Sequence, residues 1–509
     1  MLSARSMKHL LRVLAPSVLC ILGALPALFA QSGGSVEVRW DKPIRELQTT
    51  ATLQVVVNPM LRRGAKLHDH SFAALKELGA DYVRYVPWLP YPKLGVAELE
   101  PPSNGHASWD FSLIDPMTED FIKATEGHSV ILNFSTIPAW MWKVDKPVEY
   151  PSDPDKPVWK YTQGSELRDA SGAELGGYFA RLLSWYTKGG FTDEAGVVHN
   201  SGHHYQIPYW EVLNEIDIEH KMTPEQYTER YDAIVAAMRK VDPNLKFMGL
   251  AMAFEDQPRM FEYFLDPSHH QPGTPVDWIS YHFYAHPAST ENIDTWQYTF
   301  FAQADGFLNS VRYIENLRKR LSPGTRTDLD EIGAILPEDS KEFSNPGYEA
   351  PAPPKKYWNL VSALYAYLYM NVAQQGIDVI GCSQLVGYHS QFPSVTMMNF
   401  DTGAPTARYW SLKLIRESFL PGAQLVETDA GTEDIAAQAF LNHGDKKVLV
   451  VNKRNRSIQV NLPAAANGAQ LQTVDPKTGD SKWRTEKLNG QLLSLEPFSV
   501  TVVSYAAHE

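Results

Sequence analysis

Cysteine is almost absent from this chain of 509 residues, which contains only Cys20 and Cys382. Cys20 lies in an N-terminal segment that we expect to be removed, so the mature chain cannot form an intramolecular disulfide. A single cysteine also excludes a thiolate metal site. We therefore expect Cys382 to pack as a small apolar residue.

Metal-binding patterns are also missing. The histidine pairs His203-His204 and His269-His270 lie in polar stretches without a carboxylate at ligand spacing, and we read them as solvated loop residues. The sequence predicts no metal and no cofactor.

Positive charge is scarce, because 46 Lys and Arg face 59 Asp and Glu for a net charge of −13. An acidic chain gains nothing from phosphate backbones, so a nucleic-acid partner is not expected. There is no Gly-rich phosphate loop between a strand and a helix and no Gly-x-Ser-x-Gly elbow, which leaves nucleotide and serine-hydrolase functions without support. The body of the chain has no long apolar run, which argues against a polytopic membrane protein.

The N-terminus does have an apolar run, from Val13 to Phe29, after three basic residues that end at Arg12. A polar Gly/Ser stretch follows Ala30, and this order is typical of a secretory signal peptide. We predict a signal peptide over residues 1–30, a secreted or periplasmic protein, and no stable membrane partner after cleavage. An uncleaved anchor is the alternative.

Short apolar strands alternate with helical patterns between Thr50 and Phe419. Eight strand signals, most followed by a helix, predict parallel pairing in a (β/α)8 barrel over residues 50–420. One predicted helix runs from Phe307 to Leu321. A Pro-rich insertion from Lys143 to Ser165 is predicted to be a surface loop near the site.

The pattern changes after Pro421, where short strands are separated by Asn-Gly and Thr-Gly-Asp turns and no helix is evident. We predict an antiparallel β-sandwich over residues 421–509. An alternating segment from Val36 to Trp40, within residues 31–49, is expected to pair with these strands. The predicted strands are Ile435 to Phe440, Val448 to Asn452, Ile458 to Leu462, Gln470 to Val474, Leu492 to Leu495 and Val500 to Tyr505.

Two strand signals end in acids. Tyr209 to Asp217 reads as a buried strand that ends in the pair Asn214-Glu215, and a second apolar stretch, Asp328 to Gly333, carries Glu331. Parallel barrels keep their chemistry at the carboxyl ends of their strands, and two carboxylates from different strands suggest cleavage of a glycosidic bond. Glu215 is the candidate general acid/base and Glu331 the candidate nucleophile.

Other acids compete for these roles. Alternation places Glu211 on the same strand face as Glu215, and Asp328 and Asp330 lie beside Glu331. Each candidate could instead be a capping carboxylate at a strand end. Mutual repulsion within a catalytic pair is expected to raise the pKa of the protonated member.

Tryptophans also follow predicted strand ends, at Trp88, Trp140 and Trp142. Their faces could stack on sugar rings, and packing in the core or at the rim is the alternative. Together they favour a carbohydrate-binding cleft.

Four motifs carry a resemblance to a known family: Trp210 to Glu215, Asp277 to Tyr284, Asp330 to Gly333, and Trp109-Asp110-Phe111 with Asp115. With them the chain resembles clan A glycoside hydrolases, most of all family 39, which includes β-xylosidases and α-L-iduronidase.

The resemblance implies roles for individual residues. Glu215 would be the acid/base, Glu331 the nucleophile, and no cofactor would be needed. The remaining residues would form the sugar subsite: Asn214 on the hydroxyl next to the anomeric carbon, Tyr284 and Arg84 near the nucleophile, and His282 lining the subsite.

We therefore expect a secreted retaining glycosidase, β-xylosidase-like, that acts on an oligo- or polysaccharide. Another retaining clan A activity, such as a glucosidase, galactosidase, arabinosidase or iduronidase-like one, remains open. So does a barrel that binds carbohydrate without cleaving it. The sequence makes no prediction of oligomeric state.

Overall fold

A computed structural model of the chain describes residues 34–506, except 145, 147, 160, 162, 163, 344, 346 and 388–391. The predicted signal peptide, residues 1–30, lies outside the described residues. No helix in the described part of the chain is both long and apolar enough to cross a membrane.

The centre of the fold is a closed barrel of eight strands, which confirms the predicted fold class. Neighbouring strands are parallel and follow the chain order, and the last strand pairs with the first to close the ring. The barrel strands are β2 (Thr50–Val56), β3 (Val83–Val86), β4 (Val130–Leu132), β7 (Tyr209–Glu211), β8 (Lys246–Met252), β9 (Trp278–Ala285), β10 (Arg326–Ala334) and β11 (Val379–Cys382).

One α-helix follows each barrel strand, so the chain makes eight β/α units. Local capping defines two of these helix starts. At one of them, the Thr223 hydroxyl accepts from the backbone N–H of Gln226, and the Gln226 side chain accepts from the backbone N–H of Thr223, which makes a complete capping box. The helices are α1 (His68–Leu78), α2 (Asp115–Ala124), α3 (Ala173–Thr187), α4 (Pro224–Val241), α5 (Pro258–Leu265), α6 (Ile293–Leu321), α7 (Tyr357–Gln375) and α8 (Ala407–Ser418).

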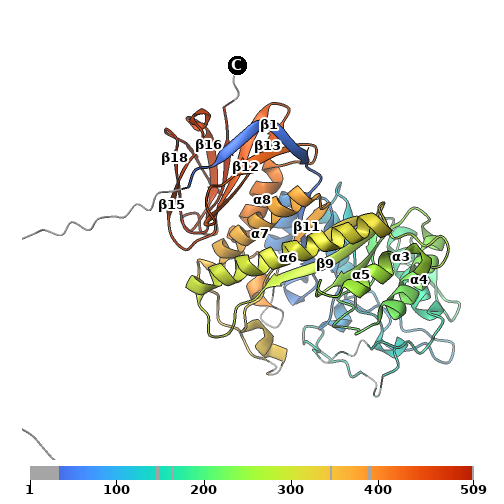
Figure 1. Ribbon diagram of the computed structural model, residues 1–509. Helices are drawn as coiled ribbons and strands as arrows, with labels where there is room; N and C mark the ends of the chain where they lie inside the picture. The colour runs from blue at the N-terminus through green and yellow to red at the C-terminus, as the bar shows by residue number, and fades with distance from the viewer. Residues whose placement is uncertain are drawn as a thin grey trace, which may run out of the picture. The chain divides into compact units, whose positions relative to one another are not determined.

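Helix α6 is much longer than predicted. The expected helix began at Phe307, but the observed one begins at Ile293, after a capping box on Asn292. Gly306 lies inside this helix and reads in the sequence as a break. Buried aromatic side chains before it, including Phe300, hold the first turns against the core, so packing overrides the glycine. Figure 1 shows α6 running alongside β9, with which it makes contact.

The barrel interior is divided into an apolar floor and a polar layer. Ile131, Met248, Trp278 and Val379 form a buried cluster near the N-terminal ends of their strands. Charged side chains, beginning with Arg84, lie beyond this floor toward the carboxyl ends. The packed floor closes one end of the barrel, so a ligand can enter only from the other.

The C-terminal part is antiparallel, as predicted. Its main sheet has seven strands in the order β1-β12-β13-β14-β19-β16-β17, and β15 pairs separately with β18. Strand β1, from the N-terminal segment, pairs antiparallel with β12, and Figure 1 shows it along the same sheet. The strands are β1 (Glu37–Glu46), β12 (Gln424–Asp429), β13 (Ile435–Asn442), β14 (Asp445–Asn452), β15 (Ile458–Asn461), β16 (Gln470–Val474), β17 (Arg484–Lys487), β18 (Leu492–Leu495) and β19 (Val500–Ser504).

Two of these strands, β12 and β17, were not predicted. Strand β17 has the sequence Arg-Thr-Glu-Lys, and all four of its residues are partly or fully exposed at the edge of the sheet. An edge strand of this kind has no apolar alternation, so only its pairing with β16 identifies it. A small hairpin, β5 (Gly190–Thr192) and β6 (Val198–Asn200), completes the described strands.

Candidate active site

Glu215 lies in a constrained loop and not at the end of a strand. The prediction extended the strand to the Asn-Glu pair, but β7 ends at Glu211. Leu213 and Glu215 then adopt left-handed backbone conformations, with φ of 64° and 41°. The N–H of Glu215 donates to the carbonyl of Ala251 at 2.8 Å, and the Asn133 amide donates to the carbonyl of Leu213 at 2.9 Å. Such strained geometry persists only where surrounding bonds hold it, and it gathers at functional sites.

Asp217 also holds this loop in place, through hydrogen bonds to the loop after β8. Its two carboxylate oxygens accept hydrogen bonds from the backbone N–H groups of Ala253 and Phe254, each at 3.0 Å. The Gln257 side chain donates a third bond, also at 3.0 Å. The loop after β7 is therefore tied to the loop after β8, which fixes the direction in which Glu215 points.

Glu331 comes from the interior of β10, where it is paired in register with His282 of β9. One carboxylate oxygen accepts from Arg84 Nη1 at 2.5 Å, and the other accepts from the Tyr284 hydroxyl at 2.6 Å. The same hydroxyl lies 2.6 Å from Ser383 Oγ. Glu331 is thus held on both oxygens by neighbours that orient it toward the barrel mouth.

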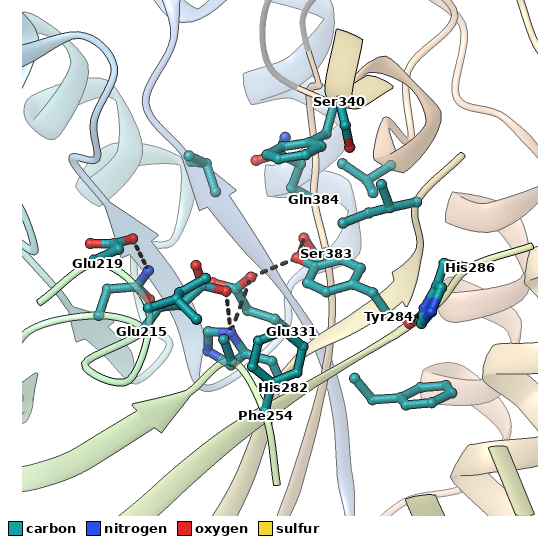
Figure 2. A pocket seen from close by; sticks show the side chains of 18 of the residues that line it. Glu215, Glu219, Phe254, His282, Tyr284, His286, Glu331, Ser340, Ser383 and Gln384 are labelled. Carbon is teal, nitrogen blue, oxygen red and sulfur yellow. Dashed lines mark hydrogen bonds and ion pairs between the residues drawn. The ribbon is translucent and has the colours of Figure 1, made fainter. Parts of the chain in front are cut away.

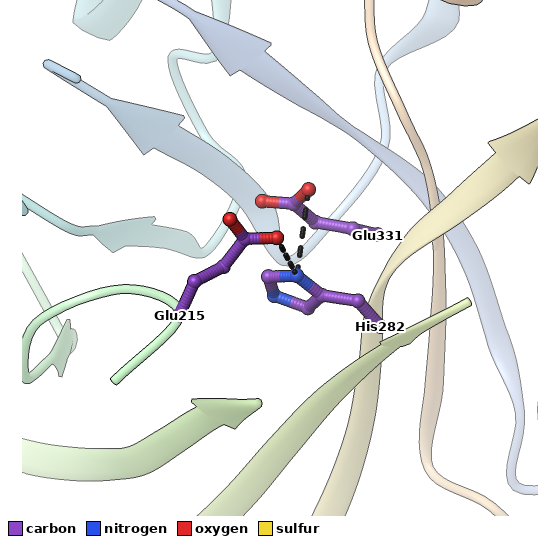
Figure 3. A group of neighbouring side chains, drawn as sticks. All are labelled: Glu215, His282 and Glu331. Carbon is purple, nitrogen blue, oxygen red and sulfur yellow. Dashed lines mark hydrogen bonds and ion pairs between the residues drawn. The ribbon is translucent and has the colours of Figure 1, made fainter. Parts of the chain in front are cut away.

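The two predicted catalytic acids meet around His282 (Figure 3). Its Nδ1 lies 3.1 Å from Glu215 Oε1 and 3.6 Å from Glu331 Oε2. One nitrogen or oxygen atom from each of the three side chains lies within 4.8 Å of the other two, so the two carboxyl groups are close neighbours. The side chains of Glu215 and Glu331 retain 15% and 9% exposure, which leaves both accessible from the cavity.

Burial and neighbouring charges shift the pKa values of Glu215 and His282. Burial raises the pKa of Glu215, and the negative charge of Glu331 adds to this, while the hydrogen bond and charge of His282 oppose it. Burial alone would lower the pKa of His282, but Glu331 and Asp330 outweigh burial and raise that pKa well above its ordinary value. The raised pKa of His282 favours an imidazole that donates toward Glu215, whose Oε1 lies 3.1 Å from its Nδ1.

Arg84 organises the layer beneath this pair. Its side chain is 1% exposed, and its Nη2 donates to Asn214 Oδ1 at 2.7 Å while Nη1 donates to Gln54 and Glu331. Its Nε lies 2.5 Å from Glu211 and 3.0 Å from Asp330. A single guanidinium thus fixes the candidate nucleophile and the amide next to the candidate acid, as its rigid fork of donors allows.

The competing acids do not reach the cavity. Glu211 is fully buried and bound by Arg84, by the Asn133 amide at 2.6 Å and by the Ser280 hydroxyl. Burial raises its pKa to about 7. Asp328 and Asp330 are also buried, inside the barrel. The structure therefore separates Glu215 and Glu331 from the neighbours that the sequence left as alternatives.

The pair opens into a cavity of about 1060 Å³ at the barrel mouth. Figure 2 shows Glu215, His282, Glu331 and Tyr284 converging in it. Its lining includes Asn214 and Trp88, which were also predicted site residues.

Two predicted stacking residues lie elsewhere. Trp142 is 2% exposed and packs against Gly164 and His220. Trp140 donates from its indole to the carbonyl of Glu98 at 2.9 Å and carries the Arg168 guanidinium on its face. Neither tryptophan lines this cavity. Both belong to the segment after β4, whose residues pack against one another.

Other lining residues were not identified from the sequence. Trp159 comes from the Pro-rich insertion, Phe392 from the loop after β11, and Phe254 from the loop after β8, where it is 53% exposed. Trp88, Trp159 and Phe392 have ring centroids 6.0 to 6.3 Å apart and form an aromatic wall. Glu219, four residues after Glu215, adds a further carboxyl. Its position in the same loop is the signal that could have pointed to it.

Glu215, His282 and Glu331 also have the spacing of a metal site, one such group among the described residues. Their surroundings do not favour a cation, because Arg84 already neutralises Glu331 and the imidazole lies between the carboxylates as a donor. The donor set fits a hydrogen-bonded acid pair better than a metal centre.

Solved structures with this fold support the architecture. The chain resembles a GH51 arabinofuranosidase from Xanthomonas axonopodis pv. citri, with a TM-score of 0.63 and 12% identity over 93% of this chain and 100% of that one. A glucosidase from Croceicoccus marinus gives 0.60 and 12% over 94% and 100%. A monomeric β-xylosidase from Caulobacter crescentus CB15 gives 0.58 and 13% over 94% and 100%. No curated protein matches the chain significantly.

The chain has the fold of these solved structures, and two carboxylates face each other at the mouth of its barrel. Residues 200–323 match the model of glycosyl hydrolases family 39. The matched stretch contains Glu215, His282 and Tyr284, while Arg84 and Glu331 lie outside it. These findings support a glycoside hydrolase and agree with the resemblance drawn from the motifs.

Proposed function

We propose that this protein is a retaining, β-xylosidase-like glycoside hydrolase in which Glu331 is the nucleophile and Glu215 the acid/base. The observation that carries the proposal is the spacing of the two acids, whose nearest oxygens lie within 4.8 Å. Retaining enzymes hold their carboxyl groups about 5–5.5 Å apart, whereas inverting enzymes need roughly 6.5–9.5 Å to admit a water between them.

In the first step, a Glu331 oxygen attacks the anomeric carbon while Glu215 gives its proton to the glycosidic oxygen. The bond between that carbon and oxygen breaks, the aglycone leaves as an alcohol, and a glycosyl ester forms on Glu331. The raised pKa of Glu215 favours the protonated form that this step requires.

In the second step, the Glu215 carboxylate takes a proton from water. The resulting hydroxide attacks the anomeric carbon, the ester bond breaks, and Glu331 leaves as a carboxylate. Arg84 and Tyr284, which contact its two oxygens, stabilise the negative charge as it returns.

The cavity lining is suited to a sugar. The aromatic wall of Trp88, Trp159 and Phe392 offers apolar faces for stacking, and Asn214 offers an amide close to the acid pair. β-Xylosidase-like action agrees with the family match and with the structural likeness to the β-xylosidase from Caulobacter crescentus. Secretion with cleavage of the signal peptide belongs to the same proposal.

Kinetics on a panel of aryl glycosides tests the function. We expect wild type to hydrolyse 4-nitrophenyl β-D-xyloside or a related glycoside with retention, and Glu331→Ala to lose activity on the order of 10³-fold or more. Azide should restore activity to both variants. Glu215→Ala should then form a glycosyl azide of retained configuration, and Glu331→Ala one of inverted configuration. Glu229→Ala, on the exposed side of α4, is the control and should behave as wild type.

Two outcomes would overturn the proposal. Inverted product from wild type would exclude double displacement. If wild type hydrolyses no glycoside in the panel but still binds sugar in titration calorimetry, a barrel that binds carbohydrate without cleaving it would be favoured.

A further inference from the structure

Glu219 is a third carboxyl at the cleavage site to which the mechanism gives no role. Its Oε1 accepts from the Trp88 indole N–H at 2.5 Å and from the Asn214 amide at 2.8 Å. Figure 2 shows it on the side of Glu215 away from Tyr284. Glu219 thus connects the aromatic wall with the residue next to the acid/base.

The amide of Asn214 is fixed from both ends by these contacts. Arg84 Nη2 donates to its oxygen at 2.7 Å, and its nitrogen donates one hydrogen to Glu219. An amide nitrogen carries two hydrogens, so one donor of Asn214 remains available for the cavity. Arg84 and Glu219 together set the direction of that donor.

The second carboxyl oxygen of Glu219 has no hydrogen-bond partner among the described residues, although it is shielded from solvent. Burial, with the nearby Glu215 charge adding to it, raises the pKa of Glu219 well above its ordinary value. A neutral carboxyl can donate as well as accept, which matches the hydrogen-bonding capacity of a sugar hydroxyl. A buried polar atom without a partner is costly, and a ligand that pairs with it recovers that cost.

We propose that Glu219 is a specificity-determining residue: it positions the Asn214 amide and selects glycosides with a free hydroxyl at the carbon next to the anomeric carbon. This inference rests on the proposed function, because it requires the sugar to lie with that carbon facing Asn214. Substrates without this hydroxyl, or with a bulky 2-acetamido group in its place, are then poor ones.

The test compares matched 4-nitrophenyl glycosides that differ only in a 2-hydroxyl or a 2-deoxy position. We expect Glu219→Ala to lower kcat/KM about 10- to 100-fold on the hydroxyl substrate, the size of a buried hydrogen bond to a reacting sugar, and less than about threefold on the deoxy substrate. Glu219→Gln keeps an oxygen acceptor for Trp88 and Asn214 and should stay within about fivefold of wild type.

Trp88→Phe removes the indole donor and keeps an aromatic ring, so it serves if Glu219→Ala fails to fold. Its loss of kcat/KM should be smaller than that of Glu219→Ala and again confined to the hydroxyl substrate. Equal losses on both substrates, or no loss with an active wild type, would overturn the role of Glu219 alone. A wild type that cleaves neither substrate would overturn the proposed function and this inference with it.

Discussion

At the scale of single residues, His282 is the group through which the two acids influence each other. Its Nδ1 is within 3.6 Å of an oxygen of both Glu215 and Glu331, and its Nε2 lies 3.5 Å from Asp330. The carboxylates of Glu331 and Asp330 raise the pKa of the imidazole, and the imidazole in turn opposes the rise in the pKa of Glu215 that burial causes. The acidity of the proposed proton donor therefore depends on His282.

His282→Asn is expected to change the pH profile as well as the rate. The acid must be protonated, so activity falls as pH rises through the pKa of Glu215. Removing His282 removes the hydrogen bond and the positive charge that lower this pKa, so the alkaline limb of kcat/KM should move to higher pH.

Steady-state kinetics between pH 4 and 10 would measure this shift. Glu215→Gln is the control, because it removes the titrating group and should abolish the limb. An alkaline limb that stays in place or moves to lower pH in His282→Asn would contradict the assignment of Glu215 as the acid.

At the scale of elements, short strands and close helix packing place the site. Strand β7 has three residues, so the chain leaves the barrel early and Glu215 reaches the mouth on a loop. Behind it, α3 and α4 pack closely because α3 carries Gly176 where the two helices meet. A Cβ on Gly176 would lie 2.7 Å from the Ala233 carbonyl oxygen and 3.0 Å from Ala237 Cβ.

Gly176→Ala is therefore expected to destabilise the protein by about 1–3 kcal/mol, since the helices must separate. Gly177→Ala is the matched control in the same helix, where the nearest atom is the mobile end of Arg181 at 3.3 Å. That change should be neutral or stabilise by up to about 1 kcal/mol, because alanine favours the helix. Chemical denaturation of both variants distinguishes close packing from helix propensity, and equal effects would contradict the packing argument.

At the scale of the whole molecule, the barrel and the C-terminal sheet share one hydrophobic core. Strand β14 alternates between two sides: Leu449 and Val451 belong to the cluster that contains the barrel helices, whereas Val448 and Val450 face the cluster covered by β15 and β18. Helices α7 and α8 contact β14, β16 and β19. The sheet therefore stabilises the barrel from outside, on the helices that follow β10 and β11.

Phe440→Ala tests this shared core. Phe440 is 2% exposed, and its ring centroid lies 4.2 Å from that of Phe419, just after α8. Its truncation should lower the free energy of unfolding by about 3–5 kcal/mol. The barrel and the sheet should then unfold together at a lower midpoint temperature. Thermal unfolding followed by circular dichroism and by residual activity should give one transition by both probes.

Leu492→Ala is the control for this change, since Leu492 is 47% exposed. Its truncation should change the free energy of unfolding by no more than about 0.5 kcal/mol. Two separated transitions in Phe440→Ala, with activity following only the second, would show that the sheet does not support the barrel.

The sequence by itself determined the periodicities and therefore the architecture. Apolar strand and helix patterns are local, so the eight β/α units and the change to antiparallel strands after Pro421 could be predicted. Motifs at two strand ends also identified Glu215 and Glu331 as a pair. Edge strand β17 and the first half of α6 were missed, because pairing and aromatic packing define them.

Only the tertiary structure decided which side chains share the cavity. Barrel closure turned Glu211 into the interior and Glu215 toward the mouth, although alternation had placed both on one face. It likewise left Trp140 and Trp142 outside the cavity and brought in Glu219 and Trp159. The physical reason is that loop direction depends on distant contacts, such as those of Asp217 and Arg84, which no local pattern records.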